Sequence, residues 1–183
     1  EIVVDPGEEI EPEVVVNEFT TAALDFENGM VDKIPTTTWN STGTAQVQNT
    51  NKIFGNNSFE TKALGDSLYT DSNILTGSST PFTIEFYALV RNNASVSNFF
   101  NGYALLSQNR GGGDSDQHLL VQDKKSYLYR GSNGGSNPFP IQRGYKTLNY
   151  NEIYKYTLTY DGASLRLFIN DELDIVVGTN NGW

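Results

Sequence analysis

Two acidic residues near the end of the chain are the first candidates for chemistry. Glu172 and Asp174 lie two positions apart, so on an extended strand both carboxylates point to the same side. Hydrolysis of a glycosidic bond with retention needs such a pair, one acid as nucleophile and the other as acid/base. Asn170-Asp171 directly before them indicates a turn. The competing interpretation, which the sequence favours, is that the two acids are polar residues opening a return strand.

Nucleophilic and zinc-dependent catalysis find little support. His118 is the only histidine, the chain has no cysteine, and no Gly-x-Ser-x-Gly pattern occurs. Three histidine ligands for a catalytic zinc ion are therefore impossible, as is a thiolate site. His118 is interpreted as an ordinary strand or loop residue.

A glycine-rich loop offers oxygen ligands for a metal. Asn109, Asp114 and Asp116 surround Gly111-Gly112-Gly113, and calcium prefers several carboxylate and amide oxygens on a flexible loop. Their spacing matches no fixed calcium-binding loop, so a solvated loop is the alternative. Calcium is the one cofactor that the sequence suggests.

Aromatic and polar side chains in the second half of the chain suggest a sugar-binding surface. Aromatic rings stack on the apolar face of a sugar, while Asn and Arg bind its hydroxyl groups. Tyr127 and Tyr129 share one face of a predicted strand, which suits such a surface, although tyrosines also pack at sheet edges and in cores. The candidate ligand-binding residues are Tyr103, Tyr127, Tyr129, Arg130, Asn133 and Tyr145.

Charge is unevenly distributed along the chain, whose net charge is −10. Residues 1–32 hold ten acidic residues and no Lys or Arg, whereas residues 33–183 hold twelve of each sign. An anionic leader and a neutral body do not attract nucleic acid or an anionic membrane. No apolar run approaches the roughly 20 residues of a membrane helix, so we expect no membrane insertion. Residues 1–21, broken by Pro6, Gly7 and Pro12, are predicted to be an acidic linker or the tail of a preceding domain.

Period-two alternation indicates strands that bury one face. Phe82, Ile84, Phe86, Ala88 and Val90 alternate with other residues and should face the core. The same pattern predicts strands over 103–107, 119–122, 126–130, 154–160, 165–169 and 173–177, and a short strand running into a turn over 24–29. Turns are predicted at 123–125, at Asp161-Gly162 and at Asn170-Asp171. Residues 22–183 therefore predict one all-β domain without helical periodicity.

Two stretches of the chain resemble a known superfamily. Pro81-Phe82-Thr83-Ile84-Glu85-Phe86-Tyr87, preceded by Phe54 to Glu60, is similar to the front half of laminin-G-like and concanavalin-A-like jelly rolls, with Tyr87 where tryptophan is usual. Tyr154 to Asp171 is similar to the back hairpin, with Asp171 in place of glycine. The resemblance implies a two-sheet antiparallel jelly-roll sandwich. It also implies closing strands beyond this hairpin, which this chain lacks or which another segment supplies.

The resemblance also bears on catalysis and function. Related jelly-roll glucanases carry E-x-D-x-x-E, and here Val177 replaces the third acid, so an enzyme is not predicted. The leading hypothesis is a lectin-like recognition or adhesion module for a glycan or another cell-surface ligand. We expect it on a virion (phage fibre, tail or capsid decoration) or a bacterial cell surface, beside neighbouring subunits. The alternatives are a structural surface protein with protein–protein contacts only and, third, a glycoside hydrolase.

Overall fold

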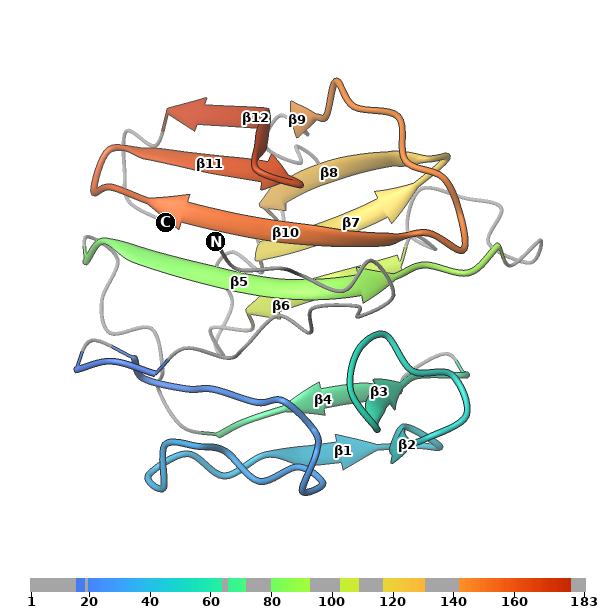
Figure 1. Ribbon diagram of the computed structural model, residues 1–183. Coiled ribbons are helices and arrows are strands. Elements are labelled where there is room, and N and C mark those ends of the chain that lie inside the picture. Colours follow the sequence, from blue (N-terminus) through green and yellow to red (C-terminus); the bar gives the residue numbers. More distant parts are fainter. Residues whose placement is uncertain are drawn as a thin grey trace, which may run out of the picture. The chain divides into compact units, whose positions relative to one another are not determined.

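The computed structural model describes residues 16–18, 20–63, 66–71, 80–92, 103–108, 117–130 and 142–178. The chain divides into two compact units, Glu1–Thr76 and Gly77–Trp183, which are described separately. The described residues form twelve β-strands and no helix, and every pairing between strands is antiparallel (Figure 1). The predicted all-β class is thus confirmed. Within these residues there is no helix long and apolar enough to cross a membrane.

Unit 1 contains two small sheets built from short strands. Strand β1 (Asn40–Thr42) pairs with β4 (Ser67–Tyr69), and β2 (Gln46–Gln48) pairs with β3 (Ser58–Glu60). Strands of three residues bury little apolar surface, so polar contacts between loops carry much of the organisation. The predicted strand at 24–29 is wrong, because only its turn forms, with Gly29 N donating to Phe26 O at 3.1 Å.

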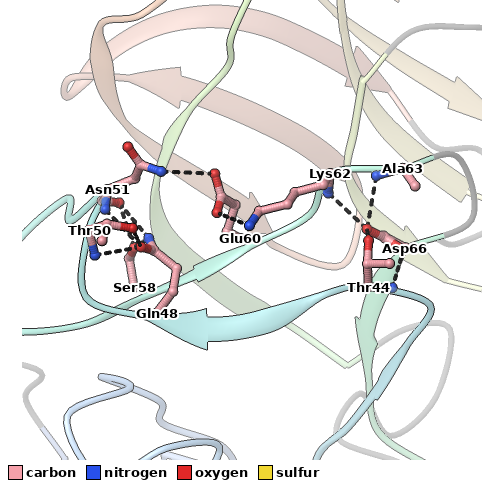
Figure 2. A network of polar contacts seen from close by, with 9 residues as sticks. All are labelled: Thr44, Gln48, Thr50, Asn51, Ser58, Glu60, Lys62, Ala63 and Asp66. Atoms are coloured by element: carbon pink, nitrogen blue, oxygen red, sulfur yellow. Dashed lines mark hydrogen bonds and ion pairs between the residues drawn. The ribbon is translucent and has the colours of Figure 1, made fainter.

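One polar network of unit 1 fixes the loop between β2 and β3 (Figure 2). The Gln48 side chain accepts hydrogen bonds from Thr50 N and Asn51 N at 2.6 and 2.8 Å and donates to Ser58 Oγ at 2.8 Å. Asn51 Nδ2 donates to Glu60 Oε1 at 3.2 Å. Glu60 Oε2 meets Lys62 Nζ at 3.2 Å, as an ion pair without hydrogen-bond geometry. These contacts connect both strands to the loop through side chains rather than through a hydrophobic core.

Asp66 closes the other end of the same network. Its carboxylate accepts hydrogen bonds from Thr44 N at 2.8 Å, Thr44 Oγ1 at 2.7 Å, Lys62 N at 2.8 Å and Ala63 N at 2.9 Å. The backbone amide of Lys62, then that of Ala63 and then the Thr44 hydroxyl group hold the pKa of Asp66 well below its usual range. Gly43 lies so close that a Cβ there would be 2.0 Å from Asp66 Oδ1, and its φ of 66° also favours glycine.

Unit 2 contains two four-stranded sheets. The β10 sheet has the order β12-β11-β10-β5, and the β7 sheet has the order β6-β7-β8-β9. Figure 1 shows the long β5, β10 and β11 lying side by side. The bounds are β5 (Phe82–Leu89), β6 (Tyr103–Gln108), β7 (Gln117–Gln122), β8 (Lys125–Arg130), β9 (Gln142–Arg143), β10 (Ile153–Tyr160), β11 (Ser164–Ile169) and β12 (Glu172–Gly178).

One hydrophobic core joins side chains from both sheets of unit 2. The predicted inward face of β5 packs against this core, and ring pairs extend across the ladder, with Phe86 and Tyr156 stacked at 5.3 Å between centroids. The alternation predicted for β5, β10 and β11 is therefore confirmed. The buried members are Val90, Leu119, Val121, Leu128, Leu148, Tyr154, Tyr156, Leu158, Tyr160, Leu165, Leu167, Ile169 and Ile175.

Tight turns of two residues connect two of the hairpins. Asp123 and Lys124 have φ angles of 47° and 59°, and Asn170 and Asp171 have 50° and 64°. Both positions in the left-handed region match the turn whose twist suits adjoining antiparallel strands. The third turn is wider: Asp161 accepts hydrogen bonds from Ala163 N and Ser164 N at 2.9 and 2.7 Å, and Gly162 has a φ of 96°.

Candidate functional site

The structure describes part of the predicted ligand-binding set. Tyr127 lies on β8, and Tyr145 follows β9 with 87% of its surface exposed. For Tyr103, Tyr129 and Arg130 the structure describes backbone pairing alone. Tyr127 pairs with Leu120, whereas Tyr103 pairs with Val121, so these two tyrosines occupy different rows of the ladder. The predicted residues outside the described part of the chain are Asn133 and the calcium candidates Asn109, Asp114 and Asp116.

Two tyrosines and two cations lie close together on β8, on β9 and in the bend that follows β9. Tyr127 of β8 pairs with Arg143 of β9. Two residues away on each segment, Lys125 Nζ donates a hydrogen bond to Tyr145 O at 2.5 Å. Ser126 and Leu128 alternate with Lys125 and Tyr127 on β8 and are buried, so Lys125, Tyr127 and its partner Arg143 belong to the opposite face. Tyr145 follows Arg143 by two residues, in the bend after β9, and is exposed. We call Lys125, Tyr127, Arg143 and Tyr145 the tyrosine–cation block. Cross-strand and diagonal neighbours on one face lie within reach of a single small ligand.

The backbone that carries Tyr145 is anchored on both sides. Gly144 N donates to Ser126 O at 2.9 Å, Lys146 N donates to Asp174 Oδ1 at 2.6 Å, and Leu148 N donates to Lys124 O at 2.8 Å. The exposed ring thus projects from a fixed segment. Holding an aromatic ring in place before a ligand arrives reduces the entropy lost on binding.

Asp174 is the buried residue that organises this segment. Its side chain is 1% exposed and accepts hydrogen bonds from Ser126 Oγ and from Lys146 N. A β-bulge allows this: Leu167 pairs with Ile175 and Phe168 with Leu173, so Asp174 has no residue opposite it. Asp174 and Ile175 are consequently both buried, which simple alternation does not predict.

Glu172 lies in a different environment from Asp174. It is exposed and pairs with Lys146 Nζ at 2.9 Å, and the same ammonium group donates to Ile169 O at 3.1 Å. The bulge separates the two acids, although their spacing in the sequence suggested a shared face. Within the described residues, both carboxylates make contacts that hold strands and loops together.

The outer face of the β10 sheet carries ion pairs. Lys155 Nζ contacts Glu85 Oε2 and Asp171 Oδ1, each at 3.0 Å. Hydrogen bonding to Glu85 and then to Asp171 raises the pKa of Lys155 to about 12. Arg166 pairs with Asp161, and this contact together with two backbone amides lowers the pKa of Asp161 to about 2. The charges on these side chains are compensated within their ion pairs, so this face has little uncompensated charge to bind a charged ligand.

Lys125 and Arg143 were absent from the predicted site. The alternation predicts no strand between 130 and 154, but Gln142 and Arg143 form β9. A strand of two residues leaves no alternation to detect, and only its register against β8 brings Arg143 beside Tyr127.

Neither metal-binding groups nor comparison with known proteins adds an assignment. The described residues contain no group of three or more His, Asp or Glu side chains that could hold a metal ion. Comparison of the chain with protein-family models, curated protein sequences and solved structures found no match.

Proposed function

We propose that this chain is a non-catalytic recognition module that binds carbohydrate through the tyrosine–cation block. The observation that carries the proposal is Tyr145, which is 87% exposed on an anchored backbone and follows Arg143, the cross-strand partner of Tyr127, by two residues. An exposed tyrosine ring offers an apolar face for stacking and a hydroxyl group for hydrogen bonding. Lys125 and Arg143 add donors for ring oxygens and hydroxyl groups.

The proposed fold is a concanavalin-A-like jelly-roll sandwich centred on unit 2. Two four-stranded antiparallel sheets that contribute to one core support this assignment. We place the module on a virion or a bacterial cell surface, where weak sites repeated over many subunits give useful avidity. Its partners there are a glycan and neighbouring subunits.

Glycan-array screening followed by titration calorimetry tests the proposal. We expect millimolar to micromolar binding to at least one glycan. Tyr145→Ala should weaken it about five- to tenfold, the effect of losing one aromatic contact. Tyr69→Ala is the matched control, because Tyr69 is a 40% exposed tyrosine in unit 1, and we expect unchanged affinity. Absence of binding to every glycan, or equal loss in both variants, contradicts the proposal.

A structural surface protein is the second candidate, supported by β12. Among the described strands β12 pairs only with β11, and it exposes Leu173 at 54% and Val176 at 49%. Its sequence contains no Lys or Pro to discourage pairing with another strand. Sedimentation analysis distinguishes the candidates: assembly abolished by Val176→Lys, without glycan binding, would favour the structural function.

A further inference from the structure

The basic side chains of unit 2 fall into two groups according to their partners. Residues 1–76 hold thirteen acidic and three basic residues, and residues 77–183 hold nine of each, so unit 1 carries the whole net charge. Within unit 2, Lys146, Lys155 and Arg166 each form an ion pair with a carboxylate. Their charges are thereby compensated locally.

The second group gathers at the tyrosine–cation block. No carboxylate of the described residues forms an ion pair with Lys124, Lys125 or Arg143. Lys124 lies in the turn before β8, and Arg143 is exposed opposite Tyr127. Lys125 donates one N–H to Tyr145 O and has no other acceptor among the described residues, so two of its three N–H groups can serve a ligand. Three cations beside the one adjacent carboxylate of Asp123 give this neutral unit a local excess of positive charge next to the exposed Tyr145 and the half-buried Tyr127.

We infer that the ligand of the block is an acidic polysaccharide, with a carboxylate or sulfate group on Arg143 and Lys125 and a sugar ring on Tyr145. This inference rests on the proposed function and names its ligand class. Arg143 and Tyr145 are two residues apart in the chain, so their Cα atoms are separated by at most about 7 Å, which is comparable with one pyranose unit. The planar guanidinium of Arg143 can bind a carboxylate or sulfate through two parallel hydrogen bonds.

The charge of the whole chain favours an anion of low charge density. Duplex DNA carries about one charge per 1.7 Å, and a protein of net charge −10 repels such a ligand at low ionic strength. A polysaccharide with one acidic group on each sugar, or on every second sugar, can place an anion on the block while neutral rings face the remaining surface. Nucleic acid is therefore the disfavoured polyanion.

Paired polysaccharides of equal backbone test the inference in the full chain. Polygalacturonate and its methyl-esterified form provide the carboxylate comparison. Lightly sulfated dextran, which has the low charge density proposed, and dextran provide the sulfate comparison. We expect the acidic member of at least one pair to bind at least about tenfold more tightly at low salt, with affinity falling as salt rises. Arg143→Gln and Lys125→Gln should each weaken acidic binding about two- to fivefold.

Matched variants separate a local from a general effect of charge. Lys52→Gln removes one exposed positive charge from unit 1, and we expect no change in acidic binding. Arg143→Lys keeps the positive charge but loses the planar guanidinium that can form two parallel hydrogen bonds. Its affinity for the acidic polysaccharide should therefore lie between those of the wild type and Arg143→Gln. Circular dichroism confirms that each variant is folded.

Each contrary outcome has a distinct meaning. Equal binding of the acidic and neutral members, or no binding of either, overturns the acidic class. The proposed function falls only if no glycan of the array binds as well. Acidic preference unchanged by Arg143→Gln and Lys125→Gln overturns the assignment to the block. Equally tight binding of single-stranded oligothymidylate shows a general polyanion surface and overturns the polysaccharide assignment.

Discussion

Replacing Gly144 with alanine should destabilise unit 2, because this glycine lies against two buried side chains. A Cβ at position 144 would lie 2.0 Å from Asp174 Oδ2 and 2.2 Å from Ser126 Oγ. Ser126 can turn its hydroxyl group away by rotating about χ1. Asp174 is 1% exposed, and the close packing of protein interiors leaves a buried carboxylate little room to move.

The magnitude follows from the hydrogen bonds that the displaced carboxylate loses. Asp174 accepts from Ser126 Oγ and from Lys146 N. A hydrogen bond to a charged group contributes about 1.5–3 kcal/mol. The free energy of unfolding should therefore fall by about 3–5 kcal/mol, similar to the cost of removing one partner from a buried charge.

Urea unfolding measured by circular dichroism gives this free energy. With an m-value of about 2 kcal/mol/M, the midpoint should drop by about 2 M. Hydrogen exchange at the amides of β11 reports on unit 2 alone. Gly178→Ala is the matched control, because a Cβ there meets nothing within 4 Å, and its effect should stay below about 1 kcal/mol.

A double-mutant cycle tests the cause. In an Asp174→Ala background the carboxylate no longer occupies the position, so adding Gly144→Ala should cost much less than in wild type. Equal costs in both backgrounds, or a Gly144→Ala protein as stable as wild type, would refute the steric explanation.

Three further predictions concern individual polar groups. Tyr160→Phe should leave the free energy of unfolding unchanged or raise it, since the Tyr160 hydroxyl is buried without a hydrogen-bond partner among the described residues. Tyr154→Phe should lower the free energy of unfolding by about 1 kcal/mol, because the Tyr154 hydroxyl bonds to Glu152 and to Asn149 N. The pKa of Asp161 is lowered to about 2 in the folded protein. The stabilisation that Asp161 gives the β10–β11 turn is therefore complete above its unfolded pKa of about 4 and disappears as the pH falls through about 2. NMR titration of the Asp161 carboxyl group measures this pKa, and a midpoint near 4 contradicts the prediction. The Lys155 pKa of about 12 should shift toward 10.5 in Glu85→Gln, measured by NMR, and an unchanged value would show that this ion pair is absent in solution.

Much of unit 2 is predictable because its core lies under long strands. Tyr154, Tyr156, Leu158 and Tyr160 repeat every second residue, and all four are buried. The turn residues Asp123-Lys124 and Asn170-Asp171 also form turns where the sequence predicts them. In these strands the period of the side chains and the position of the turns specify the same register.

The remainder depends on contacts that local sequence does not encode. Strands β1 and β2 read Asn-Ser-Thr and Gln-Val-Gln, which lack an apolar face, and they form beside partners more distant in the chain. The bulge at Asp174 interrupts alternation where a buried acid bonds to Ser126, 48 positions earlier. The tyrosine–cation block was only partly foreseen for the same reason, since two of its members meet the others through β9.

The Asn170-Asp171 turn has a consequence for protein engineering. Glycine at such positions normally relieves an unfavourable backbone conformation, so sequence-based stabilisation would replace these residues first. Here the Asn170 side chain accepts a hydrogen bond from Lys155 N at 2.9 Å, and Asn170 N donates to Lys155 O at 2.9 Å. These two bonds hold the tip of the β11–β12 hairpin to β10. An idealised Gly-Gly turn would keep the backbone bond but lose the side-chain bond, so Lys155 N would lose its partner while only the dihedral angles of the turn improved.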